Sequence, residues 1–165
     1  MKGIHMNRIS ILFLRAAVLA IGAGVLALCI FALPAMWQAV DQEHKDITYA
    51  LYGILTAFYV AAVPFFIGLY QAWRLLNLIS KSRAFSRPAV KAFRRIAYCA
   101  VVISAVLASS LPFFYVWAQD EDAPGLVVIG MFFVGASLTV SVFATLLERL
   151  FSDAVDIKSE NDLTV

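Results

Sequence analysis

Residues 71–96, QAWRLLNLISKSRAFSRPAVKAFRRI, carry seven basic side chains and no acidic one, and they lie between two long apolar runs. The basic residues are Arg74, Lys81, Arg83, Arg87, Lys91, Arg94 and Arg95. In membrane proteins, short connections rich in Lys and Arg stay on the cytoplasmic side of the bilayer. This stretch therefore predicts a membrane protein and also the direction in which its chain is threaded.

The composition of the whole chain is that of a membrane protein. Its 165 residues are 62% apolar and 15% charged, whereas soluble proteins are about 25% charged. Four apolar runs, at about residues 9–33, 47–70, 96–118 and 126–147, each hold at least the ~20 residues that cross a ~30 Å hydrocarbon core as a helix. None shows the polar stripe of an amphipathic soluble helix or the short alternation of a barrel strand.

The connections between these runs are short, which makes consecutive helices antiparallel neighbours. We therefore predict an all-α integral membrane protein, one domain over residues 1–165, with four transmembrane helices in an up-down bundle. The N-terminus, residues 71–95 and the tail hold twelve of the thirteen basic residues, whereas the other side holds one basic residue and six of the eleven acidic ones. Both termini are expected to be cytoplasmic.

On the basic side the helices are expected to extend beyond the membrane. Apolar residues continue past residue 70 at helical spacing, Ser86 is placed as an N-cap with Pro88 in the first turn, and a further stripe follows residue 147. These extensions are predicted to form a small cytoplasmic bundle from Leu75, Leu76, Leu78, Ile79, Val90, Phe93, Leu146, Leu147, Leu150 and Phe151.

Several residues in the sequence predict where the helices end. Residues 148–165 are expected to form a helix extension and a tail, whose last residues, KSENDLTV, are polar and expected to be irregular. On the opposite side, Pro34 is expected to end the first helix. The sequence Ala-Pro-Gly at residues 123–125 is a turn signal.

No motif in the sequence indicates an enzyme. The two histidines, His5 and His44, are far apart, and there is no HExxH, CxxC, GxSxG or phosphate-binding glycine loop. We expect no catalytic, cofactor-binding or metal-binding residues; Cys29 and Cys99 are interpreted as buried small apolar residues, and the acidic residues 120–122 as a solvated turn. The spans lack carboxylates and histidines, which argues against proton-coupled transport but leaves a passive path open.

Arg15 is the charged residue inside the first apolar run. Its stem can reach the headgroups by snorkelling, or its guanidinium can pair with a partner such as Glu148. The basic stretch as a whole is expected to contact anionic lipid headgroups. Docking of an acidic protein is the alternative, and direct binding of nucleic acid is not expected because aromatics for base stacking are sparse.

Four segments together carry a resemblance to a known family: FLRAAVLAIGAGVLALCIFALP in the first span, AFSRPAVKAFRRIAYCAVV in the basic stretch, DAPG, and the C-terminal DIKSENDLTV. The chain resembles the YoaS-like family of small bacterial four-helix membrane proteins of unknown function. The resemblance implies a multi-pass protein of the bacterial cytoplasmic membrane, whose gene commonly neighbours that of a small helix-turn-helix transcription regulator. It supplies no catalytic residues.

Our leading hypothesis is that the protein senses a signal and docks or sequesters such a regulator through its cytoplasmic loop and tail, because a free C-terminal carboxylate on a polar tail is a reasonable peptide ligand. Two alternatives stay open: the tail packs against the bundle and aids folding, or the protein is a small pore, exporter or immunity protein acting alone. The oligomeric state is left open. The candidate docking residues are Arg83, Phe85, Ser86, Arg87, Lys91, Glu160, Asn161, Asp162, Leu163, Thr164 and Val165.

The predicted threading can be tested by labelling single cysteines with a membrane-impermeant maleimide. A cysteine at Glu121 is expected to react in intact cells, whereas a cysteine at Arg83 or Val165 is expected to react only after the membrane is opened. Labelling of either of the last two positions from outside would contradict the predicted orientation.

Overall fold

The fold is known from a computed structural model, which describes residues 8–40, 45–81 and 85–163. Four helices in it are long and apolar enough to cross a membrane, and the described residues contain helices and turns but no strand. The elements are α1 (Arg8–Ala27), the π-helical segment η1 (Leu28–Ala32), α2 (Leu33–Val40), α3 (Lys45–Ser80), α4 (Arg87–Asp120) and α5 (Gly125–Leu163). The all-α prediction is confirmed.

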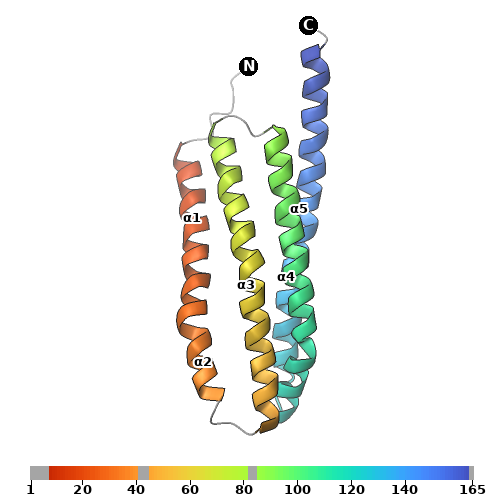
Figure 1. Cartoon of the computed structure of the whole chain (residues 1–165). Helices are drawn as coiled ribbons and strands as arrows, with labels where there is room; N and C mark the ends of the chain where they lie inside the picture. Colours follow the sequence, from red (N-terminus) through yellow and green to blue (C-terminus); the bar gives the residue numbers. More distant parts are fainter. Residues whose placement is uncertain (1–7, 41–44, 82–84, 164–165) are drawn as a thin grey trace.

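The helices run alternately up and down and pack in chain order (Figure 1). The α1, η1 and α2 segments form one nearly continuous rod that packs on α3, α3 packs on α4, and α4 packs on α5. The rod and α5 are not a packed pair, so α1 is attached along one side only. We call the end that holds the start of α1, the end of α3, the start of α4 and the end of α5 the basic end, and the opposite end the acidic end.

The packed centre of the fold is α4, which lies between α3 and α5. Small side chains at intervals of three or four residues allow its neighbours to approach closely. Ser104 Oγ donates a hydrogen bond of 3.3 Å to the backbone carbonyl of Val134 in α5, and Ser110 Oγ donates one of 2.7 Å to Leu107 O. The buried residues of α4 are Ala89, Ala92, Phe93, Ala97, Ala100, Ser104, Leu107, Ser110, Phe114 and Ala118.

The expectation that Pro34 ends the first helix is wrong, because a π-helical turn carries the helix past it. The N–H of Leu33 donates to Leu28 O, five residues back, in this wider turn. In the same register the carbonyl of Cys29 would accept from residue 34, but proline has no N–H. The hydroxyl of Tyr59 in α3 donates to Cys29 O instead, at 3.1 Å. The carbonyl of Cys29, which lipid tails could not bond, therefore has a donor. The same hydrogen bond joins η1 to α3.

The turn before α5 has the predicted place in the sequence, whereas the segment at the end of α5 differs from the prediction. Asp122 has a positive φ of 51°, and the N–H of Ala123 donates to Ala118 O at 2.9 Å, so the predicted turn after α4 ends that helix with a left-handed residue. The expected irregular tail is wrong as far as residue 163, because α5 remains helical to Leu163. Its 39 residues measure about 58 Å at ~1.5 Å per residue, nearly twice the ~30 Å hydrocarbon core.

Tyr59→Phe removes the hydroxyl that satisfies Cys29 O, so we expect it to destabilise the attachment of α1 to α3 by about 1–3 kcal/mol. The measurement is thermal unfolding of the full chain in mild detergent. Tyr70→Phe on the same helix is the matched control, since Tyr70 is exposed and has no hydrogen bond to another described residue. Equal melting temperatures for the two variants would contradict this role of Tyr59.

Candidate docking surface

The basic end is held together by an apolar cluster that joins three helices. Leu75 of α3 and Ala89, Ala92 and Phe93 of α4 are buried against one another, with Phe151 of α5 packed on them. This is the predicted packing of the helix extensions. The expected contribution of the residue stripe on α5 is wrong in part, because Leu146, Leu147 and Leu150 are exposed and Phe151 alone of the four packs into this cluster.

Phe85, a candidate docking residue, lies at the rim of this cluster. Its ring stacks on Phe151 with centroids 5.2 Å apart, and the Phe93 ring lies 5.0 Å from Phe151 on the inner side. Ser86 occupies the predicted N-cap position of α4; its side chain makes no capping hydrogen bond, while its carbonyl accepts from Ala89 N at 2.9 Å. Phe85 is still 56% exposed, so one face of its ring is available to a partner.

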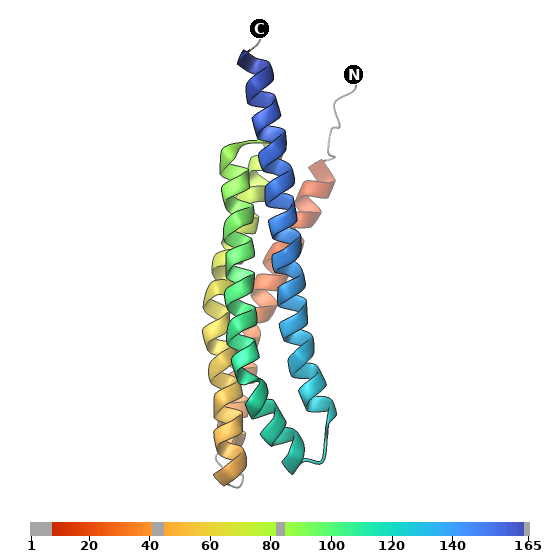
Figure 2. The same ribbon diagram turned by 90° about the vertical axis from the view of Figure 1, so that its right-hand side faces the viewer.

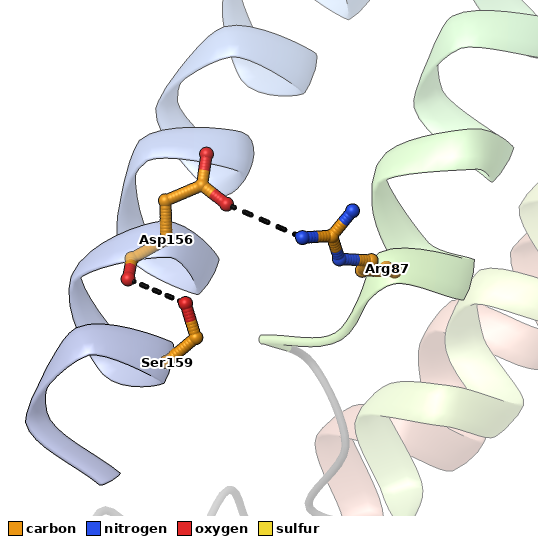
Figure 3. Close-up of polar contacts among 3 residues, drawn as sticks. All are labelled: Arg87, Asp156 and Ser159. Atoms are coloured by element: carbon orange, nitrogen blue, oxygen red, sulfur yellow. Dashed lines mark hydrogen bonds and ion pairs between the residues drawn. The ribbon is translucent and has the colours of Figure 1, made fainter. Parts of the chain in front are cut away.

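Two ion pairs connect α4 to α5, and they differ in strength. Arg94 Nη2 lies 2.7 Å from Glu148 Oε1, and its Nε donates to the same oxygen at 2.8 Å. Arg87 Nη2 lies 3.9 Å from Asp156 Oδ1, with both side chains exposed (Figure 3). Exposed pairs at such a distance add little stability. Arg87 and Asp156 can therefore give up this weak contact and bind a partner protein instead.

The possible pair between Arg15 and Glu148 is not formed, because Glu148 is engaged by Arg94 on the other side of the fold. Arg15 instead donates to Asn77 of α3. The other basic side chains described at this end are exposed and form no ion pair with a described residue: Arg74, Lys81, Lys91, Arg95, Arg149 and Lys158. The basic end has an excess of positive charge, because it carries twelve of the thirteen basic residues and five of the eleven acidic ones.

The structure places the candidate residues of the tail only in part. Glu160 is exposed on α5. Residues 161–163 continue the helix, but their side chains are not described, and Arg83, Thr164 and Val165 lie outside the described residues. The structure therefore brings Phe85 and Arg87 to the side of α5, whereas the predicted contact of the last residues is not tested.

Sequence reasoning missed one residue of this surface, Ile157, which is 65% exposed and directly follows Asp156, the partner of Arg87. Its spacing of seven residues from exposed Leu150 was the available signal, since residues two turns apart share a helix face. Elsewhere, Cys29 and Cys99 are free thiols, and both are partly exposed, so the interpretation that they are buried is wrong. Within the described residues no three His, Cys, Asp or Glu side chains group as metal ligands, those of residues 120–122 included.

The two ion pairs can be compared by double-mutant cycles on thermal unfolding in detergent. Arg94→Gln with Glu148→Gln is expected to show a coupling of about 0.5–1 kcal/mol, because the pair is short and Glu148 is largely covered. Arg87→Gln with Asp156→Asn is the control cycle, and its coupling is expected to be near zero. A larger coupling in the control cycle would contradict the ranking of the two pairs.

Comparison with known proteins places the chain in a family. Residues 35–165 match the family described as "Protein of unknown function (DUF2975)". The chain is 46% identical over 160 residues to the "Uncharacterized membrane protein YoaS" of Bacillus subtilis (strain 168), an alignment that covers 97% of this chain and 100% of that protein. No solved structure matches the chain. With four helices that can span a bilayer, the chain is a multi-pass membrane protein and belongs to the DUF2975 family, which includes YoaS.

Proposed function

We propose that this protein is a non-enzymatic docking platform of the bacterial cytoplasmic membrane, which holds a small soluble transcription regulator at its basic end and releases it when the helices respond to a signal. The basic end is assigned to the cytoplasm because it gathers almost all of the basic residues. The proposed partner is a small protein with an acidic rim and an apolar groove, since these features complement the surface described above.

The observation that carries this proposal is the free end of α5. Beyond the α3–α4 hairpin, α5 continues with no other described helix beside it (Figures 1 and 2). A helix end in water gains nothing by exposing a large apolar residue, yet Ile157 is 65% exposed near this end, directly after Asp156, which pairs with Arg87 of α4. An apolar residue on a protruding helix is the usual anchor of helix-in-groove recognition. This mode replaces the extended-tail mode, because α5 is helical to Leu163.

A mechanical argument supports the release step. The protruding end and the membrane span belong to one uninterrupted helix, Gly125–Leu163. A shift of α5 against α4 within the bilayer would therefore move Ile157 as part of the same rod. The weak Arg87–Asp156 pair opposes such a shift very little, whereas Phe151 and the Arg94–Glu148 pair act as the pivot. Packed helix interfaces with two discrete arrangements can transmit a signal in this way.

No observation favours the alternative of a pore formed by one chain. A groove of about 480 Å³ lies between α3 and α4, lined on α3 by residues 52–60 and on α4 by residues 106–113. Two turns of α3 measure about 12 Å, less than half of the hydrocarbon core. The groove therefore ends within the membrane and does not provide a path across it.

The proposal is tested by embedding the full chain in nanodiscs and measuring recruitment of the soluble protein that co-purifies with it. Ile157→Asp is expected to weaken binding at least about tenfold, because it places a charge in the apolar contact. Raising salt from about 0.1 M to about 1 M is expected to weaken binding further, since the screening length shortens.

Glu121→Ser, an exposed substitution at the acidic end, is the control and is expected to leave recruitment unchanged. Deletion of residues 160–165 measures the contribution of the tail. Undiminished recruitment by Ile157→Asp, or equal loss with Glu121→Ser, would contradict the assignment of the docking surface to the end of α5.

A further inference from the structure

Arg15 forms a polar cluster with α3 that contains no negative charge. Its Nη2 donates to Asn77 Oδ1 at 2.7 Å and to Ser80 Oγ at 3.3 Å. Its Cζ lies 5.7 Å from the ring centroid of Trp73, within the range of a cation–π contact. We call Arg15, Trp73, Asn77 and Ser80 the Arg15 cluster. Each of the three partners is neutral, so the hydrogen bonds orient the guanidinium without neutralising it.

Among the described residues, no acidic side chain forms an ion pair with Arg15. The sequence has no acidic residue before Asp41 and none between Asp46 and Asp120, so α1, the rest of α3 and nearly all of α4 lack carboxylates. Acidic residues of the basic end belong to α5, which packs on α4 and not on α1. Two of them are already engaged, Glu148 by Arg94 and Asp156 by Arg87.

The guanidinium also keeps hydrogen-bonding capacity that its neighbours do not use. Arginine has five N–H donors, and the bonds formed to described residues come from Nη2 alone. The Nε–H is buried without an acceptor. Burial of a charged donor without full compensation is costly. The Nη1 group makes no hydrogen bond to a described residue and is not one of the buried unsatisfied atoms, so it is available to an acceptor from outside the chain. A negatively charged acceptor there would compensate the charge of the guanidinium, which its three neutral partners leave uncompensated.

The position of the cluster identifies the acceptor. Trp73 follows the apolar run 47–70 of α3 by less than one turn, and Ser80 is the last residue of that helix. Tryptophan is enriched where the acyl chains meet the headgroups. At this depth the bilayer presents lipid phosphates, whose oxygens accept strong charge-assisted hydrogen bonds from a guanidinium. Exposed Arg74 and Lys81 on the same helix end add positive potential, which disfavours the ammonium of a zwitterionic lipid.

We propose that the Arg15 cluster binds the phosphate of one anionic phospholipid in the leaflet at the basic end, and that this lipid holds α1 against α3. Such a lipid would contribute to the packing of α1, because α1 has few other contacts with α3. Gly22 allows a close approach to Leu69, and Tyr59 bonds Cys29 O. Arg15 and Gly22 of α1 are seven residues apart and so share one face of that helix, and Cys29 follows after seven more residues in η1. A lipid phosphate on Arg15 would fasten the end of this face that lies nearest the headgroups.

The experiment uses the full chain in mild detergent, with phosphatidylglycerol, phosphatidylcholine of the same acyl chains, or sodium phosphate as the added probe. Native mass spectrometry counts retained lipids, and thermal unfolding reports stabilisation. We expect one phosphatidylglycerol per chain to resist removal and to raise the melting temperature, with a weaker effect of phosphatidylcholine and none of about 10 mM sodium phosphate, because a free ion lacks the acyl anchoring that raises local concentration.

Variants separate this site from general surface charge. Arg15→Gln is expected to lower the affinity for phosphatidylglycerol at least about tenfold, and Arg15→Lys to recover only part of it. An ammonium keeps the charge but lacks the two terminal nitrogens that let Arg15 bond Asn77 and Ser80 through Nη2 while Nη1 stays available. Arg74→Gln removes one exposed cation from the same end of α3 and is expected to change the affinity by no more than about twofold.

Equal retention of phosphatidylglycerol by Arg15→Gln and the wild type would overturn the proposal, and so would an equal loss in Arg74→Gln. Stabilisation by sodium phosphate as large as that by phosphatidylglycerol would overturn the assignment to a lipid. The comparison of the three probes on the wild type needs no variant. It therefore decides the question even if Arg15→Gln does not fold.

Discussion

Hydrocarbon cannot hydrogen-bond to a peptide group, and every part of this structure inside the bilayer conforms to that constraint. A spanning chain must bond its own backbone, so all four spans are helical. Where the helical pattern fails, the fold supplies a substitute: the π-helical turn before Pro34 leaves Cys29 O without a backbone donor, and Tyr59 from α3 provides one. Serine side chains in α4 and α5 likewise bond to backbone carbonyls of their own or neighbouring helices.

The same constraint explains why α1 is held by polar contacts. Between two apolar helices in lipid there is no hydrophobic driving force, because lipid tails are as apolar as the side chains they would replace. The inner helices α3, α4 and α5 associate through alanine, serine and glycine positions that permit close packing. The α1 helix presents large exposed apolar residues to lipid. Its attachment depends on Gly22, the Tyr59–Cys29 bond and the Arg15 cluster.

The basic end shows how helix length and charge together shape the exposed surface of this fold. The spans are longer than the membrane is thick, so their ends must leave it on one side. There Phe151 and the Arg94–Glu148 pair join α5 to α4, while the end of α5 extends beyond its neighbours (Figure 2). Exposed basic side chains of α3 and α4 lie at the same end of the fold, whereas the acidic residues of this end belong to α5. The end of α5 therefore presents both charged and exposed apolar side chains.

Much of this architecture was predictable from the sequence by itself. Long apolar runs have one stable solution in a bilayer, so helix number, order and alternation follow from hydropathy, and the turn at residues 119–125 and the start of α4 at Arg87 follow from local residue preferences. The charge asymmetry predicts the orientation for the same reason: charge transfer across lipid is costly whatever the packing.

Only the tertiary structure shows which side chains from different helices contact one another. Sequence could not assign Glu148 to Arg94 rather than to Arg15, because the choice depends on α5 packing against α4 and not against α1. The passage of the helix through Pro34 was unpredictable because the hydroxyl of Tyr59, 30 residues away in the sequence, bonds the freed carbonyl of Cys29. The exposure of Leu150 beside packed Phe151 depends on the rotation of α5 about its axis, which neighbouring helices set and periodicity alone does not.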